Sequence, residues 1–189
     1  MSDIQFLYGS DDSIENACRA RINVEQKEAF FQGFAEAIEN GDEEQFRFLV
    51  HLVGEMWGVL LTVSNDETKS KFSLHELYSL LWENVPSIKT GDFHFWSNDG
   101  QKNWPSSYIS KICFLIAPEK YLIIYDENNR SSLAEYFKKE VTKTALKNEA
   151  TFMEYVKTYY DREKIGTSRK TIFETDCKLW IHGKMLSGN

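Results

Sequence analysis

The sequence predicts an all-α fold, and three of its features carry this prediction. Apolar side chains recur at helical spacing through most of the 189 residues, Ser73 and Glu76 form a capping box before one such segment, and residues 43–61 are apolar on almost every side. A helix that is apolar all round packs in an interior. We therefore expect a compact bundle of six to eight helices around 43–61, with at most a vestigial strand. The chain length suits a single helical domain over residues 1–189, or two lobes of it with a cleft near residues 92–126.

The first helices are separated by a clear stop signal. In residues 24–40, Phe30, Phe34 and Ile38 fall on one helical face. The Asn-Gly-Asp sequence that follows indicates the end of one helix and the N-cap of the next. We expect the helix over 43–61 to run antiparallel to the first one.

The capping box places the next helix over residues 74–84, and Pro86 is expected to end it. Residues 86–105 mix glycine, proline and polar residues with aromatic ones, which predicts a long loop anchored by its aromatic side chains. A helix over 106–116 follows, and Pro118 is expected to break it.

The second half of the chain begins with the short apolar sequence "KYLIIYD" (120–126), which is too short for another helix. Three amphipathic helices are then expected over residues 131–148, 150–164 and 171–186. The last of them is expected to close on Gly183.

Composition excludes several classes of protein. With 42% hydrophobic and 27% charged residues, the chain is neither disordered nor a membrane protein. No basic leader precedes the first apolar residues, so we expect a cytoplasmic protein. The three cysteines, Cys18, Cys113 and Cys177, lie far apart and predict buried thiols. The four histidines show no metal-binding spacing, so we expect no metal and no cofactor.

The charge is unevenly distributed along the chain, although the net charge is −7. Residues 1–50 hold 11 acidic and 4 basic side chains, whereas residues 138–170 hold 9 basic and 5 acidic ones. One part of the chain could therefore contact phosphate, while the other would repel it.

Asp126, at the end of the short apolar sequence, has two interpretations. An aspartate in this position is commonly the N-cap of the following helix. Alternatively, a buried segment presents the carboxylate at the mouth of a cleft, where partial desolvation raises its pKa and suits it to act as a base or an electrostatic stabiliser. The two interpretations are compatible.

The passage "SSYISKICFLIAPEKYLIIYDENN" (106–129) resembles the active-site region of helix-hairpin-helix DNA glycosylases. The resemblance implies that Asp126 assists base excision in a cleft between helical subdomains. The same passage, together with "RKTIFETDCKLWIHGK" (169–184), is also similar to a group of uncharacterised small bacterial proteins that share I-Y-D and a terminal D-x-x-L-W-x-x-G-K. That second similarity implies no activity.

Further candidate residues surround this passage. Trp96, Trp104 and His94 lie in the aromatic loop, where the tryptophans could stack on an extruded base, although loop anchoring is the commoner role of such side chains. Lys111 could hold a phosphate. A group of basic residues has two interpretations: a stripe that contacts phosphates, or a plain solvated surface. The group consists of Lys139, Lys143, Lys147, Arg169 and Lys170.

Two classes of function follow from these features. The first is a nucleic-acid-associated protein that binds DNA, either a glycosylase-like enzyme using Asp126 or a degenerate relative without the chemistry. The second is a non-enzymatic protein-interaction module whose acidic N-terminal half suits a basic protein partner. An enzyme requires Asp126 to border a polar cleft, whereas a module would show Asp126 capping a helix over a filled core, with an apolar patch elsewhere.

Overall fold

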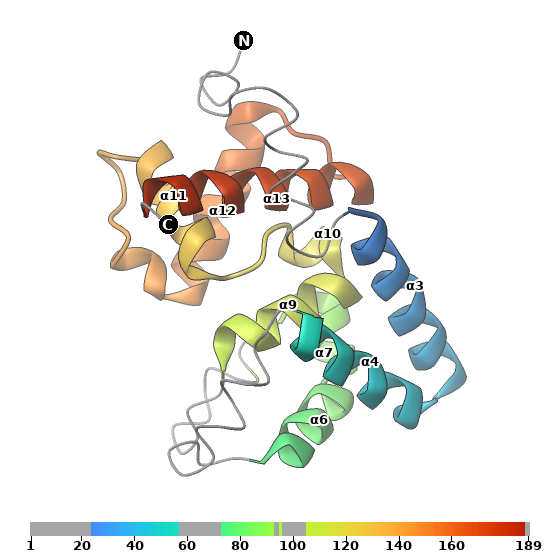
Figure 1. The fold of residues 1–189 in the computed structure, drawn as a ribbon. Helices are drawn as coiled ribbons and strands as arrows, with labels where there is room; N and C mark the ends of the chain where they lie inside the picture. Colours follow the sequence, from blue (N-terminus) through green and yellow to red (C-terminus); the bar gives the residue numbers. More distant parts are fainter. Residues whose placement is uncertain (1–23, 57–72, 93–94, 96–104, 188–189) are drawn as a thin grey trace. The chain divides into compact units, whose positions relative to one another are not determined.

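A computed structural model describes residues 24–56, 73–92, 95 and 105–187. Within these ranges the regular secondary structure is entirely helical, with nine α-helices, one 3-10 helix and no strand, which confirms the all-α class (Figure 1). The count exceeds the expected six to eight because two short helices, α7 and α10, occupy stretches that the sequence assigned to proline breaks. The structure divides into two compact units, an N-terminal unit (Glu25–Lys120) and a C-terminal unit that includes Tyr121–Asn189. Each unit is described by itself.

The described part of the N-terminal unit is built from five helices, and the short α10 (Pro118–Tyr121) spans its boundary. In chain order they are α3 (Val24–Asn40), α4 (Glu43–Met56), α6 (Leu74–Glu83), α7 (Val85–Thr90) and α9 (Ser106–Ile116). The predicted helices over 24–40, 74–84 and 106–116 are thus confirmed, and the capping box is present: Ser73 N donates to Glu76 Oε2 (2.6 Å), and Glu76 N donates to Ser73 Oγ (3.2 Å).

Pro86 does not simply end a helix. It lies in the first turn of α7, where a proline costs little because the amide hydrogens of a first turn have no partner within the helix. Gly91, with a φ of +82°, then closes α7 in the left-handed conformation that glycine adopts readily.

The most buried helix of the N-terminal unit is α9, which corrects the prediction that residues 43–61 form the central helix. Every residue of α9 from Tyr108 to Ile116 is buried, and the Tyr108 hydroxyl donates to Val50 O of α4 (2.5 Å). By contrast, α4 leaves Phe48 62% exposed and Met56 42% exposed. Residues 57–61 lie outside the described ranges. Uniform apolarity marked α4 as central, yet α4 leaves the side that carries Phe48 and Met56 exposed, while α3, α6 and α9 pack on other parts of it.

The described part of the C-terminal unit contains α11 (Glu127–Tyr136), the 3-10 helix η1 (Ala145–Lys147), α12 (Glu149–Glu163) and α13 (Arg169–Leu186). The predicted helices over 150–164 and 171–186 are confirmed to within two residues at each end. The densest packing in the unit is between α11 and α13.

The predicted helix over 131–148 is wrong in its bounds. It begins earlier, at Glu127, and ends at Tyr136. After the helix the chain forms a turn in which Val141 and Leu146 are both buried, and Ala145 N donates to Thr142 Oγ1 (3.1 Å) within this turn. The three lysines of the expected stripe therefore lie in turns and in η1, and not along one helical face.

Gly183 does not close the last helix but lies inside it, at its closest approach to α11. A Cβ atom at this position would lie 1.9 Å from the backbone oxygen of Asn128. Only glycine allows the two backbones to come this close, because any other residue would force them apart.

We predict that Gly183→Ala lowers the free energy of unfolding by about 3 kcal/mol or more, because the added methyl group meets rigid backbone that cannot yield. Urea unfolding of the full chain measures this change. The matched control is Gly166→Ala, since a Cβ at Gly166 meets nothing within 4 Å. Equal stability of the two variants would contradict the close approach of α13 to α11.

Candidate functional site

The segment 122–126, which leads into α11, is held in place by hydrogen bonds to side chains. Its Ile124 amide donates to Asp176 Oδ1 (2.9 Å), and its Leu122 carbonyl accepts from the Tyr160 hydroxyl (3.1 Å). The Ile124 carbonyl accepts from Asn129 Nδ2 (2.9 Å). Buried backbone groups need such partners, because an unpaired one costs as much as a lost hydrogen bond. This explains why an apolar sequence too short for a helix is stable here.

Asp126 is the N-cap of α11, as the first interpretation predicted. Its backbone is extended (φ −140°, ψ 174°), and its Oδ1 accepts from Asn129 N (2.9 Å). The residue is only 5% exposed. It lines neither of the two pockets described below. A catalytic role for Asp126 stays a prediction, whereas its structural role follows from the geometry.

Asp176 connects α13 to both the 122–126 segment and α11. Its Oδ1 accepts from Ile124 N and also from Asn129 Nδ2 (3.0 Å), and both Asp176 and Asn129 are buried. The sequence pattern D-x-x-L-W-x-x-G-K begins at Asp176 and includes Gly183, so its first and eighth positions both serve the packing of α13 on α11. Sequence reasoning gave this pattern no structural role.

Ser132 and His182 form a buried polar pair that sequence reasoning missed. Ser132 Oγ lies 2.5 Å from Leu179 O and 3.0 Å from His182 Nδ1. A carbonyl only accepts, so the serine hydrogen points to Leu179 O, and His182 Nδ1–H must then donate to Ser132 Oγ. The protonated Nδ1 cannot take up the serine proton, so this pair is not an activated nucleophile. Burial lowers the pKa of His182, with Glu135 opposing and Lys138 reinforcing the shift.

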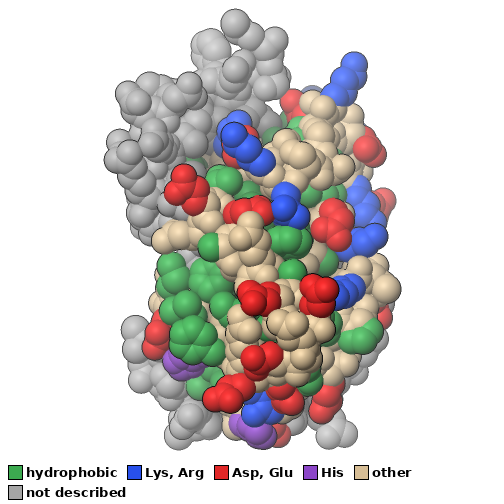
Figure 2. Space-filling model, turned by 90° about the vertical axis from the view of Figure 1, so that its right-hand side faces the viewer, with side chains coloured by type: hydrophobic (Ala, Val, Ile, Leu, Met, Phe, Trp, Pro, Cys, Tyr) green, Lys and Arg blue, Asp and Glu red, His purple; other side chains and the backbone are tan. Residues whose placement is uncertain are grey.

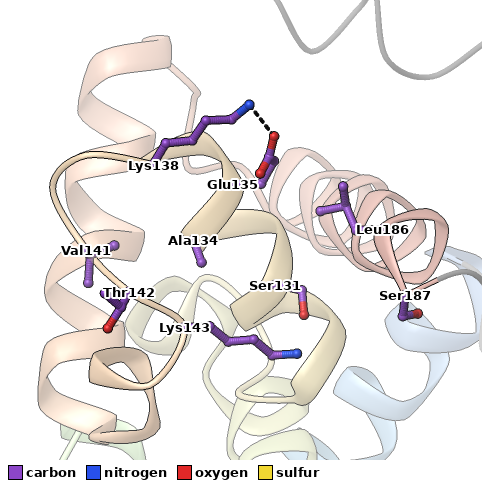
Figure 3. A pocket seen from close by; sticks show the side chains of 9 residues that line it. All are labelled: Ser131, Ala134, Glu135, Lys138, Val141, Thr142, Lys143, Leu186 and Ser187. Carbon is purple, nitrogen blue, oxygen red and sulfur yellow. Dashed lines mark ion pairs between the residues drawn. The ribbon is translucent and has the colours of Figure 1, made fainter.

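A shallow pocket of about 460 Å³ lies over the outer face of α11 (Figure 3). Ser131 and Ala134 lie between the turn that carries Lys143 and the C-terminal end of α13 at Leu186. A second pocket, of about 580 Å³, is lined by Leu179 and His182 of α13 and by residues of α11, α12 and the turn that follows α11.

Charged residues around both pockets largely pair with one another. Glu135, which lines both pockets, pairs with Lys138 (Figure 3). In the second pocket, Arg162 makes two hydrogen bonds of 2.8 Å to the carboxylate of Glu140. These pairs neutralise much of the charge that would otherwise recognise a ligand.

Lys111 lies inside the N-terminal unit. Its ammonium group donates to the carbonyl oxygen (3.1 Å) and to the hydroxyl (2.8 Å) of Ser107, one turn earlier in α9, and the side chain is buried. A phosphate contact by Lys111 stays a prediction, and it would require this side chain to leave Ser107.

The predicted basic residues differ in their surroundings. Lys143 pairs with Glu127, and Lys143 and Arg130 together hold the pKa of Glu127 down to about 2. Lys170 lies 4.0 Å from Glu174. Lys139, Lys147 and Arg169 are also exposed. The structure thus provides scattered basic side chains and no continuous stripe among the described residues.

Three predicted ligand-binding residues, Trp96, Trp104 and His94, lie outside the described ranges, as does Cys18. Cys113 and Cys177 are buried thiols, as predicted. Across the described part of the chain, no group of three histidine, cysteine or acidic side chains could hold a metal ion.

The strongest concentration of charge lies on α3, α4 and the turn between them. Residues 24–56 carry 8 acidic and 2 basic side chains. Figure 2, which faces the side on which α3 lies in Figure 1, shows acidic side chains spread over the lower half of the view beside an apolar area. The exposed acidic positions are Glu25, Glu36, Glu39, Asp42, Glu44 and Glu55.

Comparisons with known proteins give no match: no protein-family model, curated protein or solved structure is similar to this chain. Within the described ranges, no helix combines the length and apolarity that crossing a membrane requires.

We predict that Asp126→Ala lowers the free energy of unfolding by about 1 kcal/mol, the usual cost of losing an N-cap, and that Asp126→Asn costs much less because asparagine caps helices equally well. Thermal unfolding of both variants measures the difference. If asparagine proves as damaging as alanine, the carboxylate has a role beyond capping. Because Asp126→Asn keeps the fold, it is also the variant in which to test the predicted base release.

We predict that the ion pairs of Glu127 contribute stability that is present above about pH 4.5 and lost as the pH falls toward 2, because the folded-state pKa is lowered. The side chain is 60% exposed, so the contribution is about 0.5–1 kcal/mol. Urea unfolding at about pH 6 and about pH 3 should show a gap between wild type and Glu127→Gln that narrows at the lower pH. The exposed Glu154→Gln variant is the control, and a gap that does not change with pH would refute the pairing.

Proposed function

We propose that this chain is a non-enzymatic protein-interaction module that binds a basic protein segment through the acidic surface of α3 and α4. One observation carries the proposal: residues 24–56 hold eight acidic and two basic side chains, and six of the eight carboxylates are exposed. His51 Nε2 lies 3.2 Å from one of them, Glu55. Of the two basic side chains in this range, Lys27 is buried and Arg47 pairs with Glu43 (2.5 Å). The negative field of the exposed carboxylates is therefore available to a partner.

Electrostatic complementarity of this kind accelerates association and selects partners by charge. Because exposed charges are screened within about 8–10 Å at physiological salt, the interaction should be salt-sensitive and requires close contact. A basic segment of a protein satisfies both conditions, whereas nucleic acid would be repelled by the same surface.

The position of Asp126 also supports a module over an enzyme. Asp126 caps α11 beside the buried pair of Asn129 and Asp176, and apolar side chains are exposed elsewhere, on α4. These are the features expected of an interaction protein with a filled core. DNA binding through Lys139, Lys147 and Arg169 stays a prediction, and it would appear as affinity for DNA that falls steeply with salt.

We predict that the full chain binds a lysine- and arginine-rich peptide, and that the triple variant Glu36→Gln, Glu39→Gln, Glu44→Gln weakens this binding by about tenfold at low salt, since each exposed carboxylate contributes some tenths of a kcal/mol. Fluorescence anisotropy of a labelled peptide measures the change.

The matched control removes the same charge from other exposed positions, in the variant Glu119→Gln, Glu154→Gln, Asp161→Asn. Binding should be almost unchanged in this control. If both triple variants weaken binding equally, only the net charge matters and the assignment to α3 and α4 fails. Binding of DNA in place of the peptide would favour the nucleic-acid hypothesis.

A further inference from the structure

The outer face of α4 carries a row of apolar side chains in addition to its charge. Phe48 and Met56 are the two large apolar side chains most exposed in the described part of the N-terminal unit, and Leu52, partly exposed, lies between them. The three residues are four apart, so they follow one another along the same side of the helix. We call Phe48, Leu52 and Met56 the apolar ridge.

Acidic side chains stand at both ends of the apolar ridge. Glu44 lies one turn before Phe48, and Glu55 lies two turns after it, so both project from the same side of α4 as Phe48. Both carboxylates are exposed, and Glu55 also lies 3.2 Å from His51 Nε2, one turn earlier in α4. The helical rise of 1.5 Å per residue makes the ridge about 12 Å long, which equals roughly two turns of a partner helix.

The shape of this surface favours a helical partner over an extended one. A helix face offers no row of free backbone groups, so an extended segment lying on it would find no partners there for its own amides and carbonyls. A helix satisfies these groups internally and can place side chains at i, i+4 and i+7 against the ridge.

Charge also distinguishes between two molecules that could pack on the apolar ridge, a second copy of this chain and a basic partner helix. A second copy of this chain, packing α4 against α4, would bring Glu44 and Glu55 toward the same carboxylates of its partner, in a molecule of net charge −7. Such like-charge contacts disfavour self-association. A partner with lysine or arginine beside its apolar stripe would pair with Glu44 and Glu55 instead.

We infer that the partner segment is an amphipathic α-helix whose apolar stripe packs on Phe48, Leu52 and Met56 and whose flanking basic residues meet Glu44 and Glu55. The inference rests on the proposed function and specifies the partner of the same surface. The exposed carboxylates attract the basic segment to this surface, and the apolar ridge binds those helices whose apolar side chains match its spacing.

The test uses two labelled peptides of identical composition. In one, leucines recur at i, i+4, i+7 and i+11 with lysine and arginine beside them; in the other, the same residues are reordered so that no apolar stripe forms. The full chain should bind the amphipathic peptide about tenfold more tightly, which corresponds to burial of roughly one large apolar side chain. The circular dichroism of the peptide should gain helical signal on binding.

Phe48→Ala should remove most of this preference, and its exposure means that the fold tolerates the change. The matched control is Met185→Ala, which removes an equally exposed side chain (59%) from α13 and should leave the preference intact.

The outcomes separate the inference from the function that it rests on. Equal, charge-dependent binding of both peptides would keep the proposed function and overturn the helical partner. If neither peptide binds, both fail. A preference for the amphipathic peptide that survives Phe48→Ala would also overturn the inference. So would light scattering that shows a dimer of the wild-type chain and a monomer of the Phe48→Ala variant.

Discussion

The carboxylate of Asp176 organises the C-terminal unit. It accepts hydrogen bonds from the Ile124 amide and from Asn129, and so fixes a buried, non-helical segment against α13. Asp126 then stands where its carboxylate caps α11, and α11 lies so close to α13 that Gly183 has no room for a side chain. Removing one member of such a buried network leaves its partner unpaired, at a cost of about 1–3 kcal/mol.

The N-terminal unit has a buried central helix and one helix with an exposed apolar side. Its core is formed around α9, whose residues from Tyr108 onward are buried, while α4 contributes one face to that core and leaves the other exposed. The exposed face combines carboxylates with Phe48 and Met56, which do not belong to the buried core. Exposed apolar side chains in a charged surrounding are typical of contact surfaces. The acidic composition and the exposed apolar ridge both support the proposed contact surface on α4.

The sequence predicted the parts of the fold that local signals determine. The capping box at Ser73, the Asn-Gly-Asp stop after α3 and the helix over 106–116 all depend on neighbouring residues, and all are present. The end of α11 at Tyr136 and the exposure of Phe48 depend on distant packing, which helical spacing cannot reveal. For the candidate site, the capping role of Asp126 followed from its place before a helix. The Asp176–Asn129 contact spans 47 residues and had no local signal.

Native-state hydrogen exchange of the Ile124 amide in the full chain tests the central claim most directly, because this amide lies outside any helix and is bonded to the Asp176 carboxylate. We expect it to exchange as slowly as the amides in the middle of α13, through global unfolding alone. Exchange at the rate of a loop amide would contradict the account: Asp176 would not hold the segment, and Asp126 would be free for the catalytic role that the resemblance to DNA glycosylases implies.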